Sequence, residues 1–231
     1  MKSKNVNNLP FDARSVSPKE AKLRAAEGNP IGDIVAPGQN PHVHHLFSTP
    51  IWYTKCVDNL DKIHEEIEEV IPEIDFKMIP SWGSTHYLST QTFQQDLFQD
   101  FMLDSLLNEI RKNLAGYMKE ARFENRPFKM CSWLTKFEKR CYGHIHNHGT
   151  SDISGVYYHK TNGKDGDLFF QSPAPGHGMS KVFGLSCSGS RRYIPKEGVL
   201  ILFPGFLDHG INTNETDNTR ISLSFNIRFA D

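Results

Sequence analysis

The spacing of hydrophobic residues divides the chain into a helical part and a later β-rich part. Between residues 59 and 121 the apolar positions recur at helical spacing. The segment NLDKIHEEIEEVI predicts one helix, with Asp58 or Asn59 as its N-cap. The segment QQDLFQDFMLDSLLNEIRKNLAGYMKEA predicts one long amphipathic helix. The buried stripe of the long helix is expected to comprise Leu97, Phe101, Leu106, Ile110, Leu114 and Tyr117.

From about residue 131 to residue 229 the pattern changes to short β-rich segments separated by turn signals. These segments are CSWLTKFE, ISGVYYH, GDLFFQ, RRYI, GVLILFP and TRISLSFNIRF. A series of this kind predicts a sandwich, a jelly roll or a barrel, with the helices packed outside the sheets. In the last segment apolar and polar residues alternate, and taken alone this alternation predicts a half-exposed strand with Arg220 to Arg228 on its polar face.

Composition is consistent with one globular domain preceded by a polar arm. Residues 1–45 are polar and punctuated by Pro and Gly, which predicts an irregular N-terminal arm with a short helix at PKEAKLRAAEG. Residues 46–231 are expected to form a single domain, with helices at about 59–121 and core strands at about 131–229. The hydrophobic content of 38%, including 16 Phe, is sufficient for a core of this size.

The charge and the hydropathy of the chain limit the classes of partner and the cellular locations that it is expected to have. A formal net charge of −1 does not indicate a surface for nucleic acid. No apolar run approaches the roughly 18 residues of a membrane-spanning helix, and the N-terminus lacks the apolar core of a signal peptide. The expected location is therefore intracellular, in the cytoplasm, and the pattern carries no indication of oligomeric state.

The segment GHIHNHG predicts a metal site together with a histidine from a distant strand. Its histidines, His144, His146 and His148, lie two residues apart, so an extended backbone directs them to one side. His209 follows the apolar segment GVLILFP at the mouth of a later strand. Imidazole ligands from two such strands suit iron, zinc, copper or nickel and leave about three positions of an octahedral ion open.

Several motifs together resemble the 2-oxoglutarate/Fe(II)-dependent oxygenases, and within them the branch related to prolyl hydroxylases. They are HNHGTSDISGVYYH, which follows Trp133 at a fixed distance, then EGVLILFPGFLDHGI, then RISLSFN, with LFSTPIW as the opening strand. The resemblance covers roughly residues 46–229. It implies a double-stranded β-helix, which is the jelly-roll fold of the cupins, with N-terminal helices packed outside.

The resemblance also implies roles for individual residues. His146 takes the position of the first metal histidine of the family, and His209 that of the distal one. Arg220 corresponds to the arginine that binds the distal carboxylate of 2-oxoglutarate, with Ser222 beside it and Tyr158 at a further carboxylate-binding position. Arginine suits this role because it is permanently charged and binds carboxylates in a bidentate manner.

One position departs from the family pattern, because His148 stands where the family has Asp or Glu. Either the iron is bound by His146, His148 and His209, or a carboxylate comes from elsewhere, with Asp152 as the nearest candidate. We favour the three histidines, and we expect His144 to support them or to face solvent. No catalytic residue beyond the metal ligands is expected.

The implied activity is that of an Fe(II)- and 2-oxoglutarate-dependent dioxygenase that hydroxylates a small-molecule or peptide substrate and releases succinate and CO2. One alternative, suggested by the missing carboxylate ligand, is a three-histidine metal dioxygenase that does not use 2-oxoglutarate. Another is a non-catalytic jelly-roll binding protein. An all-histidine site is expected to lose metal as the pH falls through about 6.5, since only neutral imidazole binds.

Overall fold

The structure is a computed structural model in which six segments are described. They are residues 48–56, 58–79, 83–89, 95–123, 126–173 and 189–230. From Thr49 onward they belong to one compact unit. The expected polar arm, its short helix and the expected domain boundary at residue 46 lie outside the described residues.

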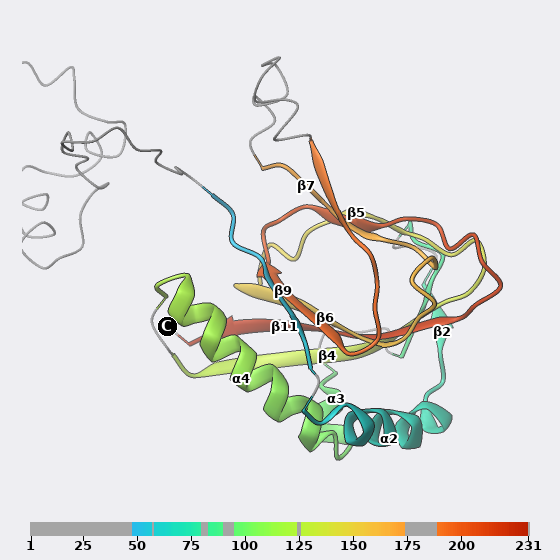
Figure 1. Ribbon diagram of the computed structural model, residues 1–231, viewed down its shortest axis with the longest axis horizontal. Coiled ribbons are helices and arrows are strands. Elements are labelled where there is room, and N and C mark those ends of the chain that lie inside the picture. Colours follow the sequence, from blue (N-terminus) through green and yellow to red (C-terminus); the bar gives the residue numbers. More distant parts are fainter. Residues whose placement is uncertain are drawn as a thin grey trace, which may run out of the picture. The chain divides into compact units, whose positions relative to one another are not determined.

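Two antiparallel sheets face each other and form the body of this unit (Figure 1). The larger sheet has the strand order β1-β9-β6-β11-β4-β3-β2, and the smaller one β5-β10-β7-β8. Their bounds are β1 Trp52–Lys55, β2 Lys77–Met78, β3 Tyr87–Leu88, β4 Phe128–Phe137, β5 Gly143–His146, β6 Ile153–Lys160, β7 Leu168–Gln171, β8 Ser190–Tyr193, β9 Val199–Pro204, β10 His209–Ile211 and β11 Arg220–Phe229. Crossovers between non-consecutive strands make this the predicted jelly-roll arrangement rather than a meander.

The helices cover the face of the larger sheet that points away from β5 and β7 (Figure 1). They are α2 (Leu60–Val70), the 3-10 turn η3 (Ile71–Glu73), α3 (Leu97–Asp100) and α4 (Asp104–Glu120). Helix α2 buries Ile63, Ile67 and Val70 against this face, as its periodicity predicts. Asn59 occupies the N-cap position of α2 but makes no side-chain cap hydrogen bond there.

The prediction of one long helix after residue 94 is wrong, because the chain breaks into α3 and α4. Phe101 is extended, with φ −136° and ψ 156°, and α4 begins only after Leu103. The cause lies in tertiary structure: the carboxylate of Glu66 on α2 accepts hydrogen bonds from the backbone amides of Ser105 and Leu106. These amides are free only at a helix N-terminus, so this contact stabilises a new helix start at α4.

The prediction that β11 is half exposed is also wrong. Along its polar face, Arg220, Ser222 and Asn226 are only 0%, 1% and 7% exposed. The reason is that β11 lies in the middle of the larger sheet, paired with β4 along its whole length and with β6 along most of it. Its apolar face packs against the helices, and its polar face points between the two sheets.

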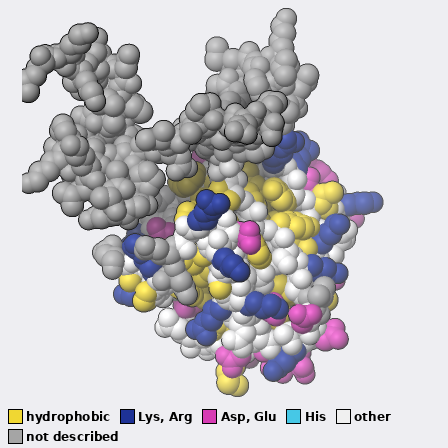
Figure 2. Space-filling view, turned by 60° about the vertical axis from the view of Figure 1, so that its left-hand side comes forward, with side chains coloured by type: hydrophobic (Ala, Val, Ile, Leu, Met, Phe, Trp, Pro, Cys, Tyr) yellow, Lys and Arg dark blue, Asp and Glu magenta, His cyan; other side chains and the backbone are white. Residues whose placement is uncertain are grey.

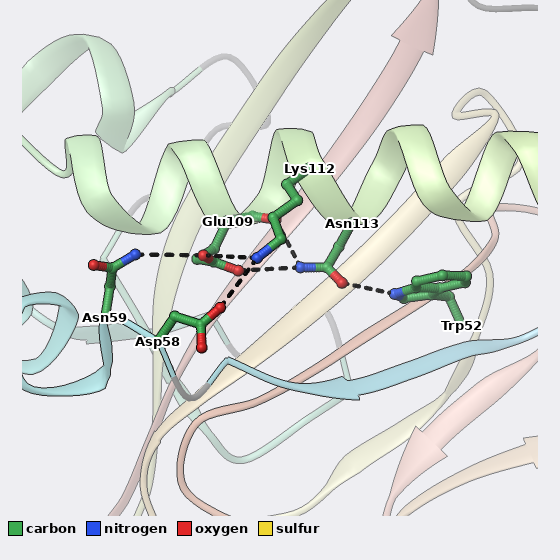
Figure 3. A network of polar contacts seen from close by, with 6 residues as sticks. All are labelled: Trp52, Asp58, Asn59, Glu109, Lys112 and Asn113. Atoms are coloured by element: carbon green, nitrogen blue, oxygen red, sulfur yellow. Dashed lines mark hydrogen bonds and ion pairs between the residues drawn. The ribbon is translucent and has the colours of Figure 1, made fainter.

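A polar network fastens β1 and the start of α2 to the buried side of α4 (Figure 3). At its centre Glu109, only 6% exposed, accepts from the Asn113 amide and pairs with Lys112. Asn113 in turn accepts a hydrogen bond of 3.0 Å from the indole of Trp52. Asp58 and Asn59 complete the network through Lys112 and Glu109 respectively. The outer helical layer is thus positioned by specific polar contacts as well as by its apolar stripe.

The surface of the unit mixes charges of both signs. On the face shown in Figure 2, basic and acidic side chains are interspersed with hydrophobic ones, in keeping with a net charge of −1. Among the helices of the described segments, none combines the length and the hydrophobicity that a bilayer crossing requires.

Candidate metal centre

Three histidines meet between the two sheets because two strands of the smaller sheet pair in a fixed register. His146, the last residue of β5, is the direct cross-strand partner of His209, the first residue of β10. His148 lies in the following turn, where its backbone amide donates to the carbonyl oxygen of Gly205 at 2.7 Å. One ring nitrogen from each histidine lies within 4.8 Å of the other two. The structure therefore brings together the three residues that the sequence singled out.

Hydrogen bonds determine which ring nitrogen carries the hydrogen in two of these histidines. Nδ1 of His146 lies 2.8 Å from the carbonyl oxygen of His144, and Nδ1 of His209 lies 2.8 Å from that of Leu207. A carbonyl oxygen can only accept, so each Nδ1 carries the hydrogen and each Nε2 keeps a free lone pair. Carbonyl-held imidazoles of this kind are usual among metal ligands.

His148 is held by a side chain of the larger sheet. Its Nδ1 lies 3.3 Å from the amide nitrogen assigned to Asn226, whose amide oxygen accepts a hydrogen bond of 2.7 Å from the hydroxyl of Ser154. An amide can present either its nitrogen or its oxygen, and a hydroxyl can accommodate both. With its amide turned over, Asn226 accepts from Nδ1 of His148 and leaves Nε2 of that ring available to a metal. The three-nitrogen donor set fits iron and other first-row metals.

Burial keeps these imidazoles neutral without a metal. Burial lowers the pKa of His148 to about 3 and that of His209 to about 4, and the neighbouring rings add to both effects. Burial likewise lowers the pKa of His146. Protons therefore compete for these nitrogens only in fairly strong acid, so metal loss is expected well below the pH of about 6.5 that free imidazole would give.

Two other residues considered from the sequence lie outside this group of three. The carboxylate of Asp152 accepts a hydrogen bond from the backbone amide of Phe229 at 2.8 Å and is not part of the cluster. His144 is exposed, and its Nδ1 lies 2.6 Å from the hydroxyl of Ser84. Its ring is 5.2 Å from that of His146.

The three histidines open into a cavity of about 410 Å³ between the sheets. The polar face of β11 forms one wall, including Arg220, Ser222 and Ser224, and Tyr158 of β6 lies beside them. Burial raises the pKa of Tyr158 to about 12, so its hydroxyl stays neutral at physiological pH. The residues expected to bind a metal and those expected to bind 2-oxoglutarate thus line the same cavity.

Arg220 is fully buried, yet most of its hydrogen-bonding capacity is unused. Its Nη1 donates to the carbonyl oxygen of Gly166 at 2.6 Å, and the guanidinium carbon lies 4.1 Å from the ring centroid of Phe137. Its Nε and Nη2 are buried and have no hydrogen-bond partner among the described residues. Burial also lowers the pKa of this guanidinium. An unpaired buried cation is costly, so this arrangement favours an anionic ligand.

The contact between Gly166 and Arg220 requires a glycine. Gly166 has φ +103°, and a Cβ atom there would lie 2.4 Å from the carbonyl oxygen of Asn212. Only glycine allows both this conformation and this close approach. The turn before β7 therefore sets which nitrogen of Arg220 is occupied and which two remain available.

The sequence reasoning missed three residues of this site. Thr135 of β4 bonds the hydroxyl of Ser222 at 2.8 Å, and His86 stacks on Phe137 with ring centroids 4.5 Å apart. Burial lowers the pKa of His86 to about 4. The third is Asn226, whose place on the polar face of β11 was visible but whose partner was not. For Thr135 the signal would have been the strand register, since it pairs directly with Ser222.

Replacing Asn226 with alanine is expected to lower the metal affinity by about 10- to 100-fold, because the orientation of His148 is lost. A competition titration against a chromogenic chelator measures this affinity. Ser224→Ala is the matched control, since it removes a hydroxyl from the same strand face and leaves the contact between His148 and Asn226 intact. Equal affinities of the two variants would exclude the positioning role of Asn226.

A sequence comparison with protein families gives one match. The family described as "Putative 2OG-Fe(II) oxygenase" matches residues 131–226, which contain all three histidines and Arg220. No curated protein matches the chain.

Solved structures share the fold at low sequence identity. A prolyl-4-hydroxylase from Pseudomonas putida is 12% identical, with a TM-score of 0.57 over 80% of this chain and 96% of that one. HygX from Streptomyces hygroscopicus, crystallised with nickel and 2-oxoglutarate, is 12% identical, with a TM-score of 0.55 over 78% and 82%. SnoN, a non-heme α-ketoglutarate-dependent epimerase from nogalamycin biosynthesis, is 11% identical, with a TM-score of 0.57 over 79% and 78%. The predicted double-stranded β-helix is thereby confirmed.

Proposed function

We propose that this chain is a 2OG-Fe(II) oxygenase that hydroxylates a small-molecule or peptide substrate with consumption of 2-oxoglutarate; the family match over residues 131–226 and the shared fold support this proposal. The observation that carries the proposal is the buried Arg220, which has two unpartnered donor nitrogens in the same cavity as the three histidines. A metal site alone would not need such an arginine. A keto acid that binds the metal at one end and an arginine at the other does.

In this proposal His146, His148 and His209 hold Fe(II) through Nε2, because their Nδ1 atoms are engaged elsewhere or face Asn226. When bound, the iron supplies the redox chemistry that couples decarboxylation of 2-oxoglutarate, to succinate and CO2, to O2-dependent hydroxylation of a C–H bond. Asp152 is not proposed as a ligand, since its carboxylate is engaged with the Phe229 amide.

The protein groups around the keto acid would bind and orient it. Nε and Nη2 of Arg220 would donate to its distal carboxylate in a bidentate pair. The hydroxyl of Thr135 donates to the carbonyl oxygen of Ser222 and lies 2.8 Å from the Ser222 hydroxyl, so the Ser222 hydroxyl would turn from Thr135 to donate to the same carboxylate. Tyr158, neutral and buried, would supply a further donor. Apolar walls such as Phe203 and Leu168 would exclude water from the cavity.

An anaerobic calorimetric titration of 2-oxoglutarate into metal-loaded and metal-free protein tests this proposal. We expect tight binding that requires the metal. Metal uptake without 2-oxoglutarate binding would favour the three-histidine dioxygenase that uses no keto acid. Failure to take up metal would favour the non-catalytic binding protein.

A further inference from the structure

A second pair of histidines lies outside the cavity, where α2 covers the larger sheet. His64 belongs to α2 and His159 belongs to β6. Because His159 follows Tyr158 along the strand, it faces the helices while Tyr158 faces the cavity. Neither histidine lines the cavity, and the proposed function gives neither of them a role.

A carboxylate determines which nitrogen of His159 is free. Nε2 of His159 lies 2.7 Å from a carboxylate oxygen of Glu68, which is one turn beyond His64 on α2. The carboxylate accepts, and burial lowers the pKa of this imidazole, so the neutral ring carries its hydrogen on Nε2 and keeps a lone pair on Nδ1. Metal-binding histidines are commonly oriented by a carboxylate in this way.

One nitrogen of each ring is buried without a partner. His159 is only 2% exposed, and its Nδ1 makes no hydrogen bond within the part of the chain that the structure describes. The same holds for Nε2 of His64. Leaving such atoms unpaired costs free energy. A single ion that accepts a lone pair from each ring would satisfy both nitrogens at once.

The separation of the two rings suits one metal ion. Their centroids are 4.7 Å apart, in an edge-to-face arrangement with an interplanar angle of 69°. Among the three histidines of the candidate metal centre, the corresponding centroid distances are 4.5, 5.0 and 5.1 Å. The pair therefore has the spacing of imidazoles that converge on a common point.

The surroundings of the pair are negatively charged and adjoin solvent. The side chain of Glu68 is 60% exposed, and His64 is only partly buried. Glu65 and Glu69 are exposed on the same helix, and the charge of Glu197 also acts on His159. Negative charges of this kind raise the local concentration of cations.

We propose that His64 and His159 bind one late first-row divalent cation, zinc or copper rather than iron, between α2 and β6. The ligand atoms are Nε2 of His64 and Nδ1 of His159. Water completes the coordination, since no group of three metal-ligating side chains forms around this pair among the described residues. Two imidazoles make this site weaker than the three-histidine centre, and imidazole sites bind copper and zinc more tightly than iron(II). The inference does not depend on the proposed function.

Zinc binding to four full-length proteins tests the inference. They are the native chain, His64→Gln, His209→Ala and the double variant, compared by equilibrium dialysis at the same zinc concentrations. His64→Gln is expected to bind one zinc ion fewer than the native chain, and the double variant one fewer than His209→Ala. Differences between variants are decisive rather than total uptake, because the chain has further histidines at 42, 44, 45 and 177.

The same four proteins distinguish the two sites. If His64→Gln binds as many zinc ions as the native chain, the inference is wrong. If the double variant binds as many as His209→Ala, the ion belongs to the three-histidine centre and the inference fails as well. An unchanged zinc count in His209→Ala would contradict the three-histidine centre alone.

The His209→Ala background also isolates the effect of this ion on stability. Zinc is expected to raise the midpoint of thermal unfolding of His209→Ala, because the ion binds the folded state and ties α2 to the larger sheet. The double variant should show no such rise. An equal rise in both proteins would place the stabilising ion elsewhere and contradict the inference.

Glu68 provides a second test at a largely exposed side chain, and it replaces His64→Gln if circular dichroism shows that this variant does not fold. In the His209→Ala background, Glu68→Gln should weaken zinc binding by about 10- to 100-fold, because the orientation of His159 is lost. Glu65→Gln is the matched control, since it removes the same charge from an exposed position of α2. Equal weakening by both substitutions would mean that zinc follows the charge of the helix, and would overturn the proposed pair of ligands.

Discussion

Arg220→Ala will lower the affinity for 2-oxoglutarate by at least a hundredfold, and metal binding will remain unchanged. The guanidinium is fully buried, and two of its donors have no partner among the described residues. Removing one partner of a buried ion pair typically costs about 3–5 kcal/mol, or more than a hundredfold in affinity. Calorimetry with 2-oxoglutarate and a chelator competition for the metal measure the two affinities separately.

Two further variants give this experiment its specificity. Arg220→Lys keeps the charge but loses the bidentate geometry, and we expect an intermediate affinity. Arg228→Ala serves as the control, because Arg228 has the same parity on β11 but is exposed and bonds the backbone of Thr150. If 2-oxoglutarate binds Arg220→Ala as tightly as the native protein, the carboxylate does not lie at Arg220.

Acidifying the metal-free protein from pH 7 to pH 4 will lower its free energy of unfolding by several kcal/mol. Burial lowers the folded-state pKa of His86 to about 4, of His209 to about 4 and of His148 to about 3. In the unfolded chain these groups titrate near 6.5. Between pH 6.5 and about 4 the unfolded state therefore binds more protons, so stability rises with pH and is lost on acidification.

Chemical denaturation at half-unit pH intervals measures this dependence. Each histidine contributes at most about 1.4 kcal/mol for each pH unit, and repulsion among the clustered rings makes the total less than additive. His86→Leu, which removes one half-buried histidine outside the cluster of three, should show a shallower slope than the native protein. A stability that is constant from pH 7 to 4.5 would mean that these rings are not buried as described.

The pH dependence of the metal affinity should be shifted to lower pH for the same reason. The usual imidazole pKa predicts metal loss near pH 6.5, whereas the buried rings predict a nearly constant affinity from pH 8 to about 5 and a steep fall below it. The sequence cannot reveal this shift, since it arises from the depth of the site and from the packing of three rings that are distant along the chain.

The cluster of three histidines could be predicted because its signal is local. The alternation at His146 and His148 and the place of His209 after an apolar strand are both visible in the sequence. The position of Arg220 on a polar strand face was visible too. What local pattern could not provide was the register between strands, which pairs Thr135 with Ser222 and aligns Ser154 with Asn226.

The errors in the fold prediction share a cause. The break after α3 depends on Glu66, nearly 40 residues away, which binds the amides at the start of α4. The burial of the polar face of β11 depends on the second sheet that covers it. In both cases a long-range contact overrides what the local pattern favours.

The central position of β11 has a consequence for how this site can change over evolution or by design. The apolar residues of β11 face the helices and its polar residues face the cavity, so inserting one residue into the strand would exchange the two sets beyond that point. Leucine and isoleucine would then point toward the ligands, while arginine and serine would enter the helical interface. Length changes in β11 should therefore abolish folding and binding together.

Point substitutions on the cavity face of β11 should have a smaller effect on folding than changes in its length. Ser224 lines the cavity, lies on the strand face away from the helices, and is only partly buried. A new side chain there changes the shape offered to a substrate while the apolar parity of the strand stays intact. The alternation of apolar and polar residues along β11 therefore tolerates no shift, whereas substitutions at single cavity-facing positions can change the substrate preference.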